Sequence, residues 1–297
     1  MKKTSKKSEQ WLKLPASGIM VSLQHFLINA LKTASSILKI LIQSKRATPI
    51  CNPTPFDEVV VLGNGPSAKE FLEQKQDFLQ QKAILAVNFF AKHEKFTQLK
   101  PAFYVLADPA FFLREEAASI LDILRNSVNW NLLLMIPNYA KKQALWKEKQ
   151  AVLLQNTSIK IAYYNMTKID GFDCFLYRAI SKGWGLPAPR NVLVPSIAHC
   201  IRMDFKTIYV AGADHSWIKQ LWINDNNEVM IDDKHFYDTS NSNPTVHKAA
   251  PLHIILESIS LALKSYIHLN NLAQKKNVRI LNITPGSYID VFDRLKI

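Results

Sequence analysis

The residues best suited to chemistry lie in three segments, the last two of which adjoin each other at His215. The first is Gly63-Asn64-Gly65-Pro66-Ser67, in which two glycines allow a tight turn and a close approach of the backbone to a ligand. Ser67 is expected to cap the helix that follows, and the free N–H groups at a helix N-terminus favour a phosphate. The amide of Asn64 is a candidate ligand for a phosphate or a sugar. A strand–turn–helix joint that binds nothing is the alternative for this short motif.

The other two segments are Asp214-His215 and the polar stretch 215–250, which also contains His235 and His247. Histidine is suited to proton transfer because its pKa lies near neutrality. The stretch is rich in Asp, Asn and aromatic residues, so we expect a lid over the site and not core.

Asp232-Asp233-x-His235 has the residue types of a site for a hard divalent ion. A polar turn of the lid explains the same residues, and we favour the turn. No metal ligand and no cofactor are therefore predicted, and a divalent ion stays open.

The elements that must position these segments are short apolar strands separated by helical stretches. Strands that are apolar on both faces are typical of a parallel sheet covered by helices on both sides. The sequence therefore predicts an α/β fold with a doubly wound, mostly parallel sheet. The expected strands are Val59–Leu62, Ala83–Val87, Phe103–Leu106, Leu132–Ile136, Ile159–Tyr163, Thr207–Ala211 and Val278–Ile283.

Ligands of such sheets bind beyond the carboxyl ends of the strands. The site is therefore sought among the residues that directly follow each strand. These are Gly63–Ser67, Asn88, Asp108, Pro137–Asn138, Asn165, Asp214–His215 and Thr284–Ser287.

The order of these motifs resembles a known enzyme family. A strand, G-N-G-P-S, a helix, a second strand ending in Asn88 and a third ending in Asp108-Pro109 are similar to the sialyltransferases of glycosyltransferase family 42 and to the related motility-associated flagellin glycosyltransferases. The segment Thr207–Asp214 resembles the strand and Gly-x-Asp turn of both groups. The resemblance covers roughly residues 57–112 and 190–215. It implies a Rossmann-like, GT-A-type variant of the sheet and a CMP-activated sugar donor.

The resemblance also implies roles for individual residues. The family's Asn-Pro after the third strand is Asp108-Pro109 here, and Arg190 matches the Arg of an Arg-x-Thr-Ser-Gly stretch whose Ser-Gly is missing. Because an acid near a phosphate is unfavourable, Asp108 is expected to meet a ribose hydroxyl. The implied substrate-binding residues are Gly63, Asn64, Gly65, Pro66, Ser67, Asn88, Asp108, Arg190 and Asp214.

The family's general base is a histidine in the segment after the Gly-x-Asp strand. By its position just before the long helix expected from Leu252, His247 is the first choice, and His215 at the strand end is the second. Tyr237 is the candidate hydroxyl that stabilises charge on the leaving phosphate.

The composition divides the chain into an arm and a domain. The net charge is +13, and residues 1–50 contribute +8 of it, with nine Lys and Arg against one Glu. Residues 51–297 are expected to form the Rossmann-like glycosyltransferase domain, with a lid at about 215–250. Three scattered cysteines indicate reduced thiols in the cytoplasm.

Within the arm, apolar residues recur three and four apart from Ile19 to Leu41, which predicts an amphipathic helix. Polar residues such as Gln24, His25 and Lys32 interrupt the apolar run, so a spanning helix is not expected. Two interpretations stay open: an in-plane helix in which residues 1–46 bind an anionic membrane surface, or a helix that packs on the domain or a second subunit. The first gives a peripheral protein on the inner face of the cell membrane. No nucleic-acid partner is expected, and a homo-oligomer stays open.

The function predicted from the sequence is transfer of a CMP-activated acidic sugar, such as a sialic acid, another nonulosonic acid or Kdo. The acceptor is expected to be a surface glycan or a lipid-linked molecule. The alternatives are a 6-hydroxymethylpterin diphosphokinase-like enzyme that uses ATP and magnesium, and a membrane-associated binding protein without catalysis.

Overall fold

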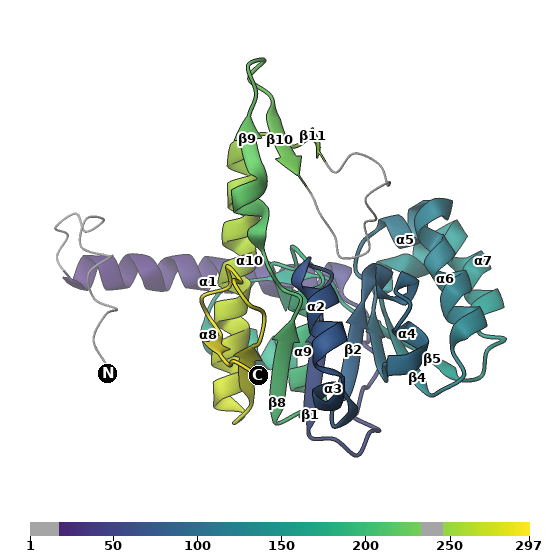
Figure 1. Ribbon diagram of the computed structural model, residues 1–297. Coiled ribbons are helices and arrows are strands. Elements are labelled where there is room, and N and C mark those ends of the chain that lie inside the picture. The colour runs from purple at the N-terminus through teal and green to yellow at the C-terminus, as the bar shows by residue number, and fades with distance from the viewer. Residues whose placement is uncertain (1–17, 233–245) are drawn as a thin grey trace.

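The computed structural model describes residues 18–232 and 246–297, which fold around one eight-stranded sheet (Figure 1). Every pairing within this sheet is parallel, and the strand order is β13-β12-β8-β1-β2-β3-β4-β5. The strands are β1 (Glu58–Leu62), β2 (Ala83–Val87), β3 (Phe103–Val105), β4 (Leu132–Pro137), β5 (Ile159–Tyr164), β8 (Thr207–Ala211), β12 (Arg279–Asn282) and β13 (Asp293–Arg294). The predicted fold class is confirmed.

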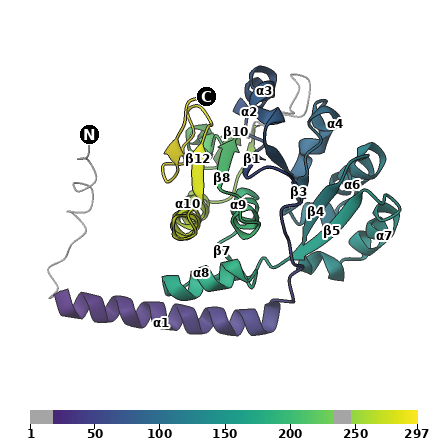
Figure 2. The ribbon, with the colours of Figure 1, turned by 90° about the horizontal axis from the view of Figure 1, so that it is seen from below.

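Both faces of the sheet are covered, as the apolar strands predicted. In β1, Val59 and Val61 pack into one core, and Val60 and Leu62 pack into the other. The first core includes side chains of α8 (Asp173–Ser181), α9 (Leu193–Arg202) and α10 (Leu252–Lys275). Figure 2 shows these helices on one side of the sheet and the following ones on the other. They are α2 (Ser67–Gln74), α3 (Gln76–Gln80), α4 (Phe96–Leu99), α5 (Ala110–Leu113), α6 (Glu115–Ser127) and α7 (Ala144–Leu153).

The order in which the chain adds strands to the sheet reverses between β1 and β8. Strands β1 to β5 follow one another toward one edge, and β8, β12 and β13 extend toward the other. At such a reversal of strand order a crevice is expected beside the carboxyl ends of the strands.

The segment after β8 forms a small antiparallel sheet that stands above this edge (Figure 1). It consists of β9 (Leu221–Ile223), β10 (Val229–Asp232) and β11 (Val246–Lys248). The long helix α10 begins at Leu252, as predicted, and returns the chain to the main sheet.

The N-terminal helix α1 (Gly18–Gln43) lies outside the layer that contains α8 (Figure 2). It borders a two-stranded sheet of β6 (Lys168–Ile169) and β7 (Leu186–Pro187). The chain after α1 is held at the end of β5, where the Asn165 side chain accepts a hydrogen bond from Lys45 N at 2.9 Å and donates one to Lys45 O at 2.7 Å. Asn138 donates to the same Asn165 oxygen at 3.1 Å. These two strand-end asparagines therefore anchor the arm.

Candidate functional site

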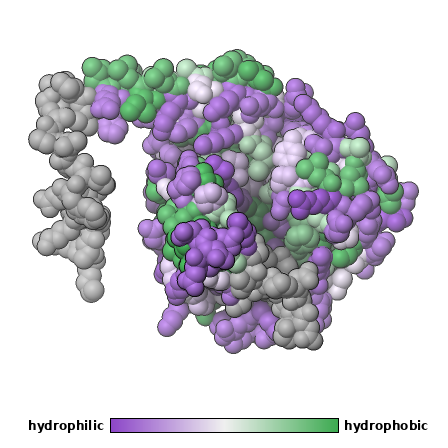
Figure 3. Space-filling model, turned by 90° about the horizontal axis from the view of Figure 1, so that it is seen from above, coloured by the Kyte–Doolittle hydropathy of each residue, from purple (hydrophilic) through white to green (hydrophobic). Residues whose placement is uncertain are grey.

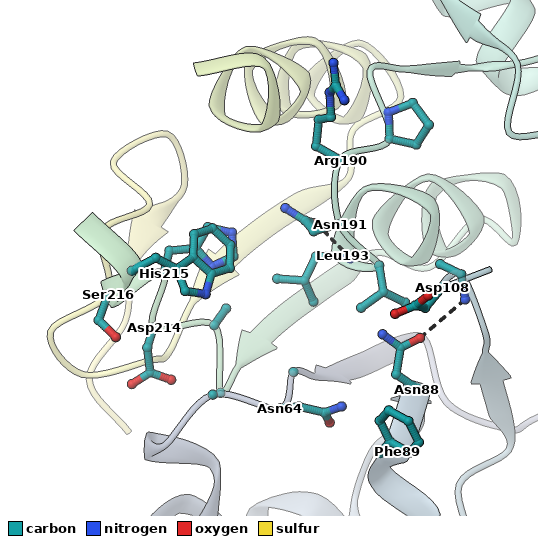
Figure 4. A pocket seen from close by; sticks show the side chains of 18 of the residues that line it. Asn64, Asn88, Phe89, Asp108, Arg190, Asn191, Leu193, Asp214, His215 and Ser216 are labelled. Carbon is teal, nitrogen blue, oxygen red and sulfur yellow. Dashed lines mark hydrogen bonds between the residues drawn. The ribbon is translucent and has the colours of Figure 1, made fainter. Parts of the chain in front are cut away.

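A cavity of about 590 Å³ opens at the carboxyl ends of the central strands (Figure 4). Its walls are the segments that follow β1, β2, β3, β4 and β8, together with the loop that leads into α9. It lies where the strand order reverses, as expected for a doubly wound sheet. Of the predicted site residues, the lining includes Gly63, Asn64, Gly65, Pro66, Asn88, Asp108, Arg190, Asp214 and His215.

The glycines of the first turn are required because this turn touches the turn after β8. Gly63 N donates to Ala211 O at 2.8 Å, and Gly65 N donates to Gly212 O at 2.9 Å. A Cβ on Gly63 would lie 2.4 Å from Gly212 O, and one on Gly65 would lie 2.0 Å from an Asp214 carboxylate oxygen. The close approach predicted for the glycines is therefore made to a neighbouring turn of the chain itself.

The predicted cap at Ser67 is wrong. Helix α2 begins at Ser67, and the Ser67 hydroxyl donates to Asp214 Oδ2 at 2.8 Å. Ser67 N also points to this carboxylate, 3.3 Å from Oδ1. Burial raises the pKa of Asp214, and the hydrogen bonds from Ser67 oppose that rise. Because a carboxylate already lies at the N-terminus of α2, we do not expect a phosphate to bind there.

Three asparagine amides face the cavity from three different elements. Asn64 donates Nδ2 to Val87 O at 3.3 Å, and its buried Oδ1 has no partner among the described residues. Asn88, in the left-handed region with φ 47°, accepts a bond from Ala107 N at 3.3 Å, so that its amide nitrogen faces the cavity. Asn191 has a buried Nδ2 without a partner in the same set of residues. The Asn88 amide nitrogen therefore faces the cavity, and its wall also contains two buried polar atoms, Asn64 Oδ1 and Asn191 Nδ2, without partners among the described residues.

The two ends of the cavity differ in charge. Asp108 lines it and accepts a bond from Ala110 N at 2.8 Å, which leaves its second oxygen for a ligand. Arg190 is exposed at the rim, and among the described lining residues it is the one permanent cation. A ligand with an anionic group is therefore expected to turn that group toward Arg190 and away from Asp214.

His215 is the buried titratable side chain of the cavity wall. Its Nε2 lies 2.7 Å from the Tyr266 hydroxyl, and that hydroxyl donates to Asn191 Oδ1 at 3.1 Å. Asn191 Oδ1 also accepts bonds from Leu193 N and Val194 N, which fixes the orientation of the amide.

This network selects one tautomer of His215. Because the single hydroxyl proton of Tyr266 goes to Asn191, the hydroxyl oxygen must accept a bond from His215 Nε2–H. The Nδ1 lone pair then remains for a reacting proton. Burial lowers the pKa of His215 to about 4, so that the imidazole is neutral at physiological pH. The Trp217 ring covers it at a centroid distance of 4.4 Å.

The other catalytic predictions concern the lid. His247 belongs to β11, opposite Ile231 in the antiparallel pair, and its role as the base stays a prediction. Tyr237, Asp233 and His235 lie outside the described residues. Within residues 18–232 and 246–297, no group of three or more His, Cys, Asp or Glu side chains has the arrangement of a metal site.

Sequence reasoning missed Asn191 and Tyr266. Asn191 directly follows the predicted Arg190, and its position before α9 was the available signal. Tyr266 lies among apolar residues of α10 at helical spacing, a pattern that indicates core packing. The predicted strand-end residues Thr284 and Ser287 bond to the turn after β8. Thr284 Oγ1 accepts a hydrogen bond from Ala213 N at 3.1 Å, and the Ser287 hydroxyl donates to Ala213 O at 2.7 Å.

Comparison with known proteins gives matches by structure. No family model and no curated protein matches the sequence. The MAf glycosyltransferase from Magnetospirillum magneticum AMB-1 is 12% identical with a TM-score of 0.45, over 91% of this chain and 38% of that one. The sialyltransferase CstII from Campylobacter jejuni, in complex with the substrate analogue CMP-3FNeuAc, is 12% identical with a TM-score of 0.42, over 80% of this chain and 85% of that one. A variant of CstII in complex with CMP is 14% identical with a TM-score of 0.41.

The chain spans less than two fifths of the length of the MAf glycosyltransferase. All three TM-scores lie below 0.5, so the function is inferred from the residues of the cavity alone.

Proposed function

We propose that this chain is a glycosyltransferase that takes an acidic sugar from a CMP-activated donor. The observation that carries the proposal is the cavity at the reversal of strand order, where three amides and a neutral histidine face one space. Crevices at this position of a doubly wound sheet bind nucleotides. A nucleotide has both hydrogen-bond donors and acceptors, and the amides of Asn64, Asn88 and Asn191 offer both.

The charges suggest how the donor lies. A phosphate is disfavoured beside Asp214 and favoured near the Asn88 amide nitrogen and Arg190. The free oxygen of Asp108 suits a ribose hydroxyl, which is a donor. Asn64 Oδ1 needs a donor as well, and the exocyclic amino group of a cytosine or a second hydroxyl would satisfy it.

His215 is the proposed general base. Its Nδ1 accepts the proton of the acceptor hydroxyl while that oxygen attacks the anomeric carbon. The bond between the anomeric carbon and the phosphate oxygen breaks, and CMP leaves with the electron pair. Tyr266 is a positioning residue, since it fixes the tautomer and orientation of the imidazole, and Asn191 Oδ1 supports it by accepting the Tyr266 hydroxyl proton.

A donor with negative charge also improves this base. A phosphate and a sugar carboxylate near His215 favour the imidazolium form and raise its pKa from the value of about 4 that burial produces. Proton transfer then becomes efficient only when the donor is bound. The acceptor is proposed to be a surface glycan or a lipid-linked molecule at the cytoplasmic side of the membrane.

Thermal-shift measurements with CMP, CDP, UDP and ATP, each with and without Mg²⁺, test the proposal. Stabilisation by CMP without the metal supports it, because the amides and Arg190 bind the nucleotide directly. A response to ATP and Mg²⁺ in place of CMP contradicts it in favour of pyrophosphoryl transfer. No response to any nucleotide contradicts it in favour of a binding protein without catalysis.

A further inference from the structure

Helix α1 is inverted with respect to an ordinary amphipathic helix. The centre of the face that packs on the domain is polar: Ser36, 1% exposed, donates to Asp170 O at 2.7 Å, and its hydroxyl accepts a bond from Asp170 N at 2.8 Å. Two apolar contacts flank it, since the Phe26 ring lies 5.3 Å from that of Phe172 and Ile40 packs against the core. Thr33 Oγ1 accepts a bond from Phe172 N at 3.0 Å. At the C-terminal end, the Ser44 hydroxyl donates to Trp184 O at 2.5 Å.

The opposite face is apolar and unpartnered within the described residues. Its large side chains are between 53% and 75% exposed, whereas leucines on surface helices usually point inward. Figure 3 shows them as a row along α1 on the outer edge of the molecule. The row consists of Leu23, Leu27, Leu31, Leu38, Leu41 and Ile42.

We propose that this row of side chains binds an anionic lipid surface, with α1 lying in the plane of the membrane. An exposed apolar patch of this kind marks an interaction site. The arm that contains it carries +8, which anionic lipid neutralises. Pairing with a second copy through the same row would instead bring two such arms together, and their repulsion opposes that pairing.

The polar contacts decide between an in-plane and a spanning helix. By length and composition Ser22–Gln43 is sufficient to cross a bilayer, so the polar interruptions of the sequence do not exclude it. However, the helix is bonded to the domain along its side from Lys32, which pairs with Asp170 at 2.9 Å, to Ser44. A spanning helix would have to break these bonds or carry the polar loop of Asp170 into hydrocarbon. The in-plane arrangement keeps all of them.

Sedimentation of the full chain with vesicles tests the proposed membrane binding. We expect binding to vesicles that contain phosphatidylglycerol, weaker binding in high salt, and little binding to phosphatidylcholine alone. Leu31→Asp/Leu38→Asp should weaken binding by about 100-fold or more, since burial of each leucine contributes roughly tenfold. Leu113→Asp/Leu154→Asp is the matched control, because both leucines are exposed outside α1, and it should bind like the wild type.

Three outcomes overturn the proposal: equal loss in both double variants, equal binding to both kinds of vesicle, or a dimer that Leu31→Asp/Leu38→Asp dissolves. Circular dichroism of the variants keeps a folding defect apart from a binding defect. None of these measurements uses the cavity, so their failure leaves the proposed glycosyl transfer untouched.

Spin labels attached one at a time at Leu23, Leu31 and Leu41, after exchange of the exposed Cys51 and Cys174 for serine, test the orientation. The in-plane helix predicts one common depth in the bilayer for the three labels. A label at Leu31 that lies much deeper than the other two would overturn the in-plane arrangement.

Discussion

The cavity and helix α1 depart from the usual distribution of polar and apolar groups in opposite ways. The cavity wall buries one amide atom each of Asn64 and Asn191, Oδ1 and Nδ2, without partners among the described residues, and α1 exposes a row of leucines. Each departure costs free energy in the isolated protein, because an unpaired buried polar group and exposed apolar surface are both unfavourable. A polar ligand would remove the first cost, and an apolar surface would remove the second.

The two regions also differ in how firmly the rest of the chain fixes them. The cavity residues are held by five strands and by hydrogen bonds across the turns, so their geometry is fixed before a ligand arrives. Helix α1 touches the domain along one side, through the hydroxyl groups of Ser36 and Thr33 and through Phe26 and Ile40. This contrast predicts that substitutions in the cavity have large, specific effects and that substitutions on the outer face of α1 leave the fold intact.

The largest expected effect is on catalysis. His215→Ala should lower the transfer rate by about 10²–10⁴-fold, because the acceptor hydroxyl loses its base. Donor binding should survive, since the base acts on the acceptor. Steady-state rates and CMP affinity measured on the same preparation separate the two effects.

His247→Ala and His235→Ala accompany this test, because His247 is the base that the sequence resemblance implies. A far larger loss in His247→Ala than in His215→Ala would reassign the base to the lid. If none of the three variants loses activity, the catalytic role of this whole region is wrong.

The next largest effect concerns the contact between the two turns. Gly63→Ala should destabilise the fold by about 3 kcal/mol or more, because the added Cβ meets Gly212 O at 2.4 Å and neither backbone can move without its neighbour. Gly286→Ala is the control: a Cβ there meets nothing within 4 Å, and only its φ of +65° opposes the change, at about 1 kcal/mol. Urea unfolding of both variants measures the difference, and equal losses would mean that the turns do not support each other.

A smaller effect links stability to pH. Burial lowers the pKa of His215 to about 4. Between pH 6.5 and pH 4 the histidine therefore binds a proton in the unfolded chain and not in the folded chain. Stability should therefore fall as the pH drops from 6.5 toward 4, with His215 contributing about 2 kcal/mol between pH 7 and pH 5. His199, whose pKa burial also lowers, adds to the fall.

The difference between the wild type and His215→Gln isolates this contribution, because both retain His199. Urea unfolding at pH 7 and pH 5 gives the slope for each protein. Identical slopes would mean that His215 is not buried as a neutral group.

The smallest expected effect tests the tautomer. Tyr266→Phe removes the acceptor of the His215 Nε2–H bond and keeps the packing of the ring. The maximal rate should fall by about tenfold and the acidic limb of the pH–rate profile should shift, while KM for the donor stays unchanged. An unchanged pH profile would leave Tyr266 with a purely structural role.

The strands that position the site could be predicted from the sequence because they depend on local hydrophobic patterns. Apolar runs such as Ala83–Val87 and Thr207–Ala211 match the observed strands in full, and topology then brings their carboxyl ends to one edge. Contacts between distant segments have no such signal. The bond of Ser67 to Asp214 joins residues 147 positions apart, and it replaced the predicted cap.

Helix α1 shows the same limit in another form. Its periodicity predicted two faces, and the usual preference for burying leucine suggested that the apolar face would be the packed one if the helix docked on the domain. Which face is buried depends on Asp170 and Phe172, which lie more than 130 positions away. The outward orientation of the leucine-rich face of α1, on which the proposed membrane contact depends, could therefore not be predicted from the sequence.

The central claim, that the cavity binds a cytidine nucleotide through its amides, is tested most directly by calorimetric titration of CMP into two matched variants. Asn88 and Asn277 both have left-handed backbone conformations, with φ of 47° and 56°, but only Asn88 lines the cavity. Asn88→Asp keeps the oxygen that faces Ala107 N and turns a charge toward the phosphate, so CMP affinity should fall by at least about tenfold. Asn277→Asp should bind CMP like the wild type. Unchanged CMP affinity in a folded Asn88→Asp variant would contradict the claim.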